Sequence, residues 1–158
     1  EGVPGVWFLS LDAGNPLAVL GARVGFALPY YQASMTLEDT TREEGGQAVH
    51  FSSRRRHPGA PPAEIDVTWR GEADLPPAEP GTLDFFLIER YCLYAERGGR
   101  LARTRIFHPP WPLRRARLEA HTSTMLAAHG LPEPAGEPLL HAQAAPLDVA
   151  IWAPEPLS

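Results

Sequence analysis

The sequence predicts an α+β domain in which mainly antiparallel strands form a strongly curved sheet or barrel, with two or three short helices. The length of 158 residues fits one domain with a core of its own. The 18 prolines, about twice the usual share, disfavour long helices and helical repeats. Short stretches of alternating apolar and polar residues, separated by turn signals, recur along the chain and favour strands.

The first predicted element is a strand over residues 5–12 (GVWFLSLD), where aromatic or aliphatic side chains alternate with small polar ones. A short amphipathic helix follows, because Asn15 is a favourable N-cap and Pro16 suits the first helical position. Apolar residues then recur at near-helical spacing until Pro29, which ends the helix.

A β-hairpin is predicted after this helix. Residues 30–37 and 47–56 flank a turn signal at residues 43–46 (EEGG). A proline-rich loop over residues 57–63 then leads to residues 64–70, which alternate most regularly of all and have one apolar and one polar face. We therefore expect a third strand beside the hairpin.

Residues 82–96 combine two patterns. Thr82 is a typical N-cap for a helix of one to two turns, whereas the sequence from about Arg90 favours a strand. The two glycines at residues 98–99 predict a hairpin turn, after which residues 100–108 return as a strand.

The prolines at residues 109–112 (PPWP) require the chain to leave the sheet. Beyond them, residues 113–129 predict a further strand or turn and then a helix around residues 122–128, which Gly130 closes. A broken last strand region spans residues 139–152.

The charged residues exclude some kinds of chemistry. The net charge of −5 argues against a surface that binds phosphate groups or nucleic acid. All 14 basic residues are arginine, so no step can use a lysine Schiff base. The single cysteine, Cys92, rules out an internal disulfide and indicates a cytoplasmic location.

Membrane and metal binding are not expected either. No apolar stretch is long enough to span a membrane as a helix. The 6 histidines show no HxH, HxxxH or HExxH spacing, and a single cysteine supports no zinc site of several cysteines. The sequence therefore predicts no metal site.

Five separated blocks of the sequence resemble one family, in the same order along the chain. They are residues 5–12 (GVWFLSLD), 15–18 (NPLA), 28–31 (LPYY), 89–94 (ERYCLY) and 108–113 (HPPWPL). Together they resemble the YqjF-like family of uncharacterised bacterial proteins (domain of unknown function 2071), and the likeness runs over most of the chain.

The resemblance implies a fold with a pocket. Members of that family are similar in fold to acetoacetate decarboxylase, a cone-like β-barrel of two curved sheets around a central pocket. That enzyme acts through a lysine, which this chain lacks. Family members usually carry several tens of residues before the block at Gly5, so the single domain of residues 1–158 is expected to lack an upstream segment. A partner, such as a second copy in a homo-oligomer, would then pair the exposed strand edge.

The arginines at residues 54–56 are the first candidate for ligand binding. Alternation along the strand sends Arg54 and Arg56 to one face and Arg55 to the other. If Arg54 and Arg56 face the barrel interior, their guanidinium groups are suited to bind a carboxylate. In the alternative, all three are exposed at the end of the strand and protect a sheet edge.

Glu89 and Arg90 lie within an apolar stretch, where unpaired charges are costly, so each is expected to have a partner. One interpretation is a structural ion network, in which the two residues pair with each other or with Arg103 or Arg105 across the hairpin. In the other, Glu89 is a general base and Arg90 holds an anionic ligand. If the backbone is extended here, we expect Arg90 to face the barrel interior together with Tyr94, and Glu89 to face the other layer.

His108 and Trp111 flank the prolines that end the second hairpin. His108 closes a strand where the rim of an active site would lie, and Trp111 is placed to form the wall of a pocket. His108 is therefore a candidate for proton transfer, and the alternative is a rim or capping residue.

The sequence thus predicts a protein that binds a small molecule, an anionic organic acid, in the barrel pocket. Any catalysis would be non-covalent, with Glu89 or His108 moving a proton and arginines holding negative charge. The competing interpretation is a ligand-binding or structural module without turnover, and the sequence does not decide between them. No cofactor, nucleic acid or membrane is expected as a partner.

Overall fold

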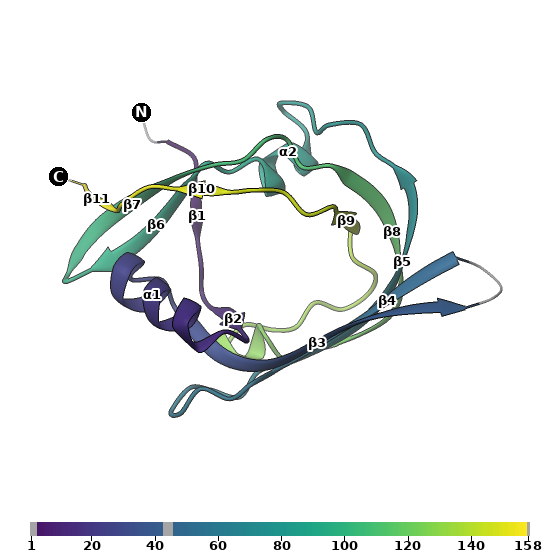
Figure 1. The fold of residues 1–158 in the computed structure, drawn as a ribbon, viewed down its shortest axis with the longest axis horizontal. Helices are drawn as coiled ribbons and strands as arrows, with labels where there is room; N and C mark the ends of the chain where they lie inside the picture. Colours follow the sequence, from purple (N-terminus) through teal and green to yellow (C-terminus); the bar gives the residue numbers. More distant parts are fainter. Residues whose placement is uncertain (1–2, 43–45, 158) are drawn as a thin grey trace.

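The structure is a computed structural model that describes residues 3–42 and 46–157. Two α-helices and two strongly curled sheets make up most of the described residues (Figure 1). Most strand pairs are antiparallel, and of the strands described here only the two short N-terminal ones join their sheets in parallel. The mostly β architecture with two α-helices confirms the predicted α+β class.

The first sheet has the strand order β1-β6-β7-β10, and β11 also pairs with β7. Its strands are β1 (Val6–Trp7), β6 (Cys92–Arg97), β7 (Arg100–Phe107), β10 (Ala150–Ile151) and β11 (Glu155–Pro156). The hairpin of β6 and β7 is its centre, as the glycine pair at residues 98–99 predicted. Both glycines have positive φ angles, 59° and 77°, which the tight turn requires.

The second sheet has the strand order β2-β3-β4-β5-β8-β9 and curls around most of the molecule (Figure 1). Its strands are β2 (Leu11–Ala13), β3 (Tyr30–Arg42), β4 (Gly46–Arg55), β5 (Glu64–Asp74), β8 (Leu113–Ser123) and β9 (Ala142–Ala144). The predicted hairpin of β3 and β4 is confirmed, and residues 43–45 of its predicted turn lie outside the described residues. The regular strand predicted from Glu64 is also confirmed and continues to Asp74.

The predicted single strand over residues 5–12 is wrong. These residues form two short strands, β1 and β2, which belong to different sheets, so the chain crosses between the sheets here (Figure 1). Gly5 permits the close approach to the first sheet, because a Cβ atom there would lie 2.7 Å from the Cys92 carbonyl oxygen. The alternation in the sequence marks two half-buried pieces and does not show that they pair with different partners.

Helix α1 (Pro16–Phe26) begins and ends where the sequence predicted. The Asn15 Oδ1 accepts hydrogen bonds from the backbone N–H groups of Leu17 and Ala18, at 2.9 and 3.3 Å. The helix ends at Ala27, whose φ angle of 54° is left-handed, shortly before Pro29. The cap, the proline at the first turn and the terminating proline are all local signals, which is why the sequence sufficed.

Helix α2 (Leu83–Ile88) also confirms its prediction. The Thr82 Oγ1 accepts from the Phe85 N–H at 3.2 Å, and the strand that follows begins at Cys92. Residues 89–91 between them are neither helix nor strand. This short connection places the Glu89 carboxylate within hydrogen-bond distance of the Trp111 backbone N–H.

The predicted helix around residues 122–128 is largely wrong. Strand β8 continues to Ser123, because Thr122 and Ser123 pair with Asp66 and Ile65 of β5. Only a 3₁₀ turn at Ala127–His129 remains, and Gly130 closes it with a φ angle of 70°. Pairing with a neighbouring strand therefore overrides the local preference for a helix. The last predicted strand region is broken into β9 and β10, as expected.

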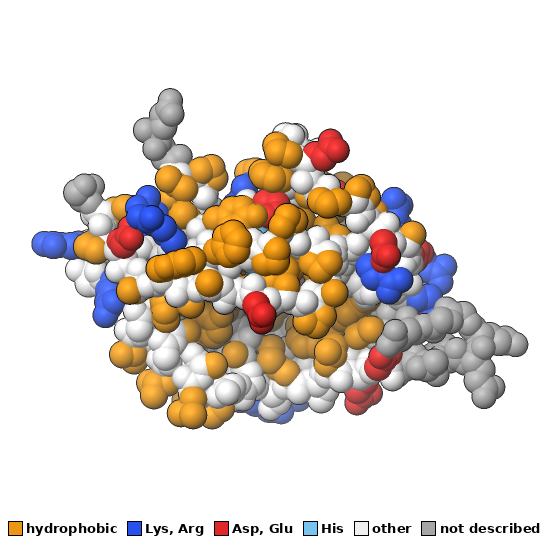
Figure 2. Space-filling view, turned by 45° about the horizontal axis from the view of Figure 1, so that its top comes forward, with side chains coloured by type: hydrophobic (Ala, Val, Ile, Leu, Met, Phe, Trp, Pro, Cys, Tyr) orange, Lys and Arg blue, Asp and Glu red, His pale blue; other side chains and the backbone are white. Residues whose placement is uncertain are grey.

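The buried core is small. Leu28, Leu93 and Ala95 form its centre, between α1 and the first sheet, and partly buried aromatic and aliphatic side chains pack around them. Many large apolar side chains stay exposed, and Figure 2 shows them spread over the face that carries α2 and β10. Phe86 and Trp152, for example, are exposed. Among the described residues, the buried apolar cluster is therefore confined to the region between α1 and the first sheet.

Candidate functional site

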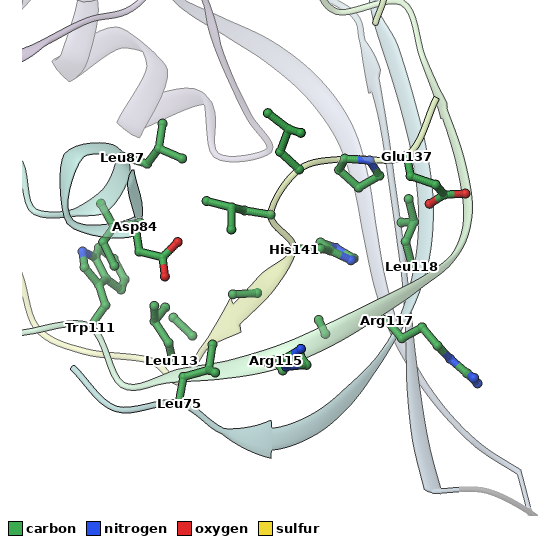
Figure 3. Close-up of a pocket in the computed structure, with 17 residues that line it drawn as sticks. Leu75, Asp84, Leu87, Trp111, Leu113, Arg115, Arg117, Leu118, Glu137 and His141 are labelled. Atoms are coloured by element: carbon green, nitrogen blue, oxygen red, sulfur yellow. The ribbon is translucent and has the colours of Figure 1, made fainter. Parts of the chain in front are cut away.

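A cavity of about 740 Å³ lies between α2, strand β8 and the segment that leads into β9 (Figure 3). Its volume is in the range of small-molecule sites in proteins. The wall is mostly aliphatic, with Trp111 on one side. The aliphatic and proline residues of the wall are Leu75, Leu87, Ile88, Leu113, Ala116, Leu118, Pro138, Leu139, Leu140, Ala142 and Ala144.

Five titratable or charged residues complete the lining: Asp84, Arg115, Arg117, Glu137 and His141. Figure 3 shows Asp84 and His141 on opposite sides of the space. Arg117 lies 3.6 Å from a carboxylate oxygen of Glu119 and is already paired. Arg115, in contrast, has no carboxylate within 4.0 Å among residues 3–42 and 46–157. Its guanidinium is the cation in the lining that a ligand would find unpaired.

His141 joins the cavity wall to the sheet. Its carbonyl accepts a hydrogen bond from the Ala116 N–H at 3.2 Å, which holds the 137–142 segment against β8. Burial, and to a lesser extent the charge of His121, lowers the pKa of His141 below its ordinary value. Burial thus favours the neutral imidazole, which adds no positive charge to the cavity.

A second polar group lies behind Trp111. Glu89 is only 6% exposed. Its Oε1 accepts a hydrogen bond from the backbone N–H of Trp111 at 3.4 Å, and its Oε2 accepts one from the Tyr91 hydroxyl. The buried ring of His108 stacks on Tyr91, with 4.7 Å between ring centroids, and lies 5.1 Å from the Trp111 ring. The structure thus brings Glu89, His108 and Trp111 together, but of these three only Trp111 lines the cavity.

Tyr91 is expected to titrate later than an ordinary tyrosine. Its hydrogen bond to Glu89, with burial and the carboxylate charge, raises the pKa of Tyr91 from 10.0 to about 12. The folded state then keeps a proton that the unfolded state loses, so this contribution to stability is complete below about pH 10 and disappears as pH rises through about 12. An absorbance titration of tyrosinate should show one late step, which Tyr91→Phe removes. The same late step in Tyr91→Phe would contradict the assignment.

Arg54 and Arg56 lie on the exposed face of the second sheet, not in the interior. The Nε of Arg54 is 2.9 Å from the Glu64 carboxylate, and the Nε of Arg56 donates to the Ser34 Oγ at 3.4 Å. Both line a smaller, polar pocket of about 430 Å³ on this sheet. The interior placement considered for this pair is therefore wrong, and a ligand-binding role for either remains a prediction.

Arg55 is the buried member of the triplet. Its Nε donates to Asp12 Oδ1 at 2.8 Å, and the two side chains are 1% and 3% exposed. Its Nη2 donates to the Ser10 Oγ at 2.9 Å, and its guanidinium lies over the Tyr31 ring, 4.3 Å from the centroid. The Ser10 Oγ is also 2.8 Å from the Nε2 of His129.

Sequence reasoning did not find this buried ion pair. The alternation of the triplet separated Arg55 from Arg54 and Arg56 but did not show which face is buried, and Asp12 lies 43 residues away along the chain. Only the pairing of β2 with β3, and of β3 with β4, brings Asp12 and Arg55 together. The pair anchors the segment that crosses between the sheets.

Arg90 and Tyr94 also lie away from the cavity lining. The half-buried Arg90 has its guanidinium 4.3 Å from the centre of the Phe86 ring, and Tyr94 donates its hydroxyl hydrogen to the Val3 carbonyl at 2.5 Å. The expected orientation, with Arg90 inside and Glu89 facing away, is wrong. Glu89 is the buried residue, because the strand begins only at Cys92 and the extended geometry does not reach back to residue 90. The ligand roles of Arg90 and Tyr94 stay predictions.

The structure defines a mostly β protein whose curled sheet and short second helix flank a largely apolar cavity. No α-helix among the described residues is long and apolar enough to cross a membrane. Within the same residues, no group of three or more histidine, cysteine, aspartate or glutamate side chains could hold a metal ion.

The chain belongs to the YqjF-like family (domain of unknown function 2071), described as an uncharacterized conserved protein, whose family model matches residues 1–146. It is 39% identical over 152 residues to the uncharacterized protein YqjF of Bacillus subtilis (strain 168). The match covers 96% of this chain and 60% of that protein, so the chain spans less than two thirds of the length of this relative. No solved structure matches the chain. The predicted family is thus confirmed.

Proposed function

We propose that this protein binds a small organic acid in the cavity between α2 and β8. The observation that carries the proposal is the cavity itself, about 740 Å³ in volume and largely apolar, with Arg115 unpaired among the described residues that line it. An acid with an aliphatic or aromatic body would bury that body against leucine side chains and Trp111. Its carboxylate would form a charge-assisted hydrogen bond with the guanidinium of Arg115.

We further propose that this chain has the fold of acetoacetate decarboxylase but does not use the reaction mechanism of that enzyme. Two curled sheets support the resemblance in architecture (Figure 1), and the cavity lined by residues of α2 and β8 agrees with it. The chain has no lysine, so the Schiff base of that enzyme has no counterpart here. A cytoplasmic location remains a prediction from the single cysteine.

Small carboxylic acids are expected to raise the melting temperature of the wild-type protein, because a ligand that binds only the folded state stabilises it by mass action. Benzoate, phenylacetate and hexanoate are suitable probes in a thermal-melt titration. In Arg115→Met, the apparent affinity for the same acids should fall about tenfold, which corresponds to the loss of about 1.4 kcal/mol.

Arg114→Met is the matched control for this experiment. Arg114 is the neighbouring residue on β8 but points to Asp74, with its Nε 2.7 Å from a carboxylate oxygen, and it does not line the cavity. Its replacement should leave the response to acids unchanged. The proposal is wrong if no acid raises the melting temperature, or if Arg115→Met responds like the wild type.

A second candidate is an enzyme that transfers protons without a covalent intermediate. The observation in its favour is the group of Glu89, Tyr91 and His108 directly behind Trp111. Such an enzyme should exchange the α-hydrogens of a 3-oxo acid with deuterium in D₂O, and Glu89→Gln should slow the exchange. Binding of acids without any exchange would favour a binding module without turnover.

A further inference from the structure

The outer surface of helix α1 has the composition of a buried helix. Among its 11 residues, Arg23 is the only charged one. Yet Leu17 is 77%, Leu20 is 59% and Val24 is 67% exposed. A helix that is apolar on all sides normally packs on all sides. The side of α1 that faces away from the sheets therefore lacks a partner among residues 3–42 and 46–157.

The total surface area agrees with a missing partner. The chain exposes 10719 Å², whereas a compact monomer of 17.3 kDa exposes roughly 7,800 Å² by the scaling of area with mass. The difference, roughly 2,900 Å², is more than the area of about 800 Å² that each partner buries in a standard protein–protein interface. This excess belongs to the whole chain, and the exposed apolar side chains of α1 are the observation that places the partner on this helix.

The charge of Arg23 does not oppose association through this face. Its Nη1 donates to the Tyr30 carbonyl at 2.8 Å, and its guanidinium lies 5.5 Å from the centre of the Tyr31 ring. The Arg23 side chain is itself exposed, but its contacts direct it toward β3, on the side of the helix that carries the buried Val19. The outer face carries no charge that would repel an identical face.

We propose that α1 packs antiparallel against α1 of a second copy of this chain, about a two-fold axis at Gly21. Such an axis pairs each residue of one helix with the residue of the other copy that lies equally far from Gly21 on its opposite side. Leu17 therefore meets Gly25, and Val24 meets Ala18. Space is open where a Cβ atom of Gly21 or Gly25 would lie, so a neighbouring helix can approach closely there.

The residue sizes on the two sides are complementary. Leu17 and Val24 of one copy each face a small residue of the other, whereas Leu20, about 100° around the helix from Gly21, lies at the edge of this contact. The same face supplies both the projections and the recesses, which is the requirement for an interface between identical copies. The antiparallel arrangement also places the two helix dipoles in opposite directions.

Cysteine cross-linking tests this geometry. Gly21→Cys should form a disulfide-linked dimer under mild oxidation, because the axis brings the two equivalent residues to within the Cβ separation of about 3.5–4.5 Å that a disulfide needs. The native Cys92 is buried and should not take part. Leu17→Cys alone should not cross-link, but mixed with Gly25→Cys it should form the heterodimer.

Leu37→Cys, on β3, is the control for random collisions because Leu37 is exposed and lies away from α1. Cross-linking of Gly21→Cys no faster than Leu37→Cys would overturn the proposal. So would efficient cross-linking of Leu17→Cys with itself, because that requires a different register or a parallel arrangement.

Sedimentation of the protein without cysteine substitutions provides the second measurement. Wild type should sediment as a dimer, and the double variant Leu17→Glu/Val24→Glu as a folded monomer, because these exposed positions tolerate charge in the single chain but not in the interface. A wild-type protein that is monomeric at all concentrations would contradict the proposal. The outer face of α1 would then be the binding surface for a different polypeptide. A dimer that persists in the double variant would place the interface on another face and equally contradict it.

Discussion

Replacing Arg55 with methionine is expected to lower the free energy of unfolding by about 3–5 kcal/mol, because Asp12 would remain as a buried charge without its partner. The Asp12 side chain is 3% exposed, and its Oδ2 already has no hydrogen-bond partner among the described residues. The salt bridge to Arg55 is therefore the main compensation for burying this carboxylate. Urea unfolding monitored by circular dichroism would measure the change as a lower midpoint.

Two variants show whether the loss comes from the unpaired charge. In Asp12→Leu/Arg55→Met both charges are absent, so much of the stability should return. Arg54→Met removes an exposed arginine whose side chain is 56% exposed beside Glu64, and should change stability by less than about 1 kcal/mol. Equal losses in Arg54→Met and Arg55→Met would refute the special role of the buried pair.

Replacing Glu89 with leucine is expected to cost about 2–3 kcal/mol of stability. The substitution removes the charged acceptor of the hydrogen bonds from the Tyr91 hydroxyl and the Trp111 backbone N–H, and a hydrogen bond to a charged group contributes about 1.5–3 kcal/mol. The Trp111 wall of the cavity should also become less ordered. Thermal unfolding would report the first effect, and the fluorescence of the tryptophans the second.

The double variant Glu89→Leu/Tyr91→Phe separates the two hydrogen bonds. It leaves only the Trp111 N–H without its acceptor, so the loss should be smaller than in Glu89→Leu alone. If Glu89→Leu is as stable as the wild type, Glu89 has no structural role behind Trp111, and the proton-transfer candidate gains weight. An additive loss in the double variant would show that Tyr91 and Glu89 are not coupled.

The elements that the sequence predicted well are those with local signals. Helix α1 follows from Asn15, Pro16 and Pro29, and the hairpin of β6 and β7 follows from the glycines at residues 98–99. These signals act through hydrogen bonds and backbone angles within a few residues, so no knowledge of the rest of the chain is needed.

The two wrong elements depend on distant partners. Residues 5–12 divide between two sheets because Val6 pairs with Leu93, whereas Leu11 pairs with Tyr30. Ser123 stays in a strand because it pairs with Ile65. Strand pairing is a tertiary interaction, and the side-chain pattern of one segment does not show which neighbour it meets.

For the site, the sequence by itself determined the kinds of residues available: arginines without lysine, a glutamate in an apolar stretch, and a tryptophan beyond a proline pair. Tertiary structure alone decided which of them meet. It turned Arg55 inward and left Arg54 and Arg56 outside, and it placed Glu89 behind Trp111. The physical reason is that charge burial depends on a partner supplied by another strand, as Asp12 is for Arg55, and only the folded chain brings such partners within hydrogen-bond distance.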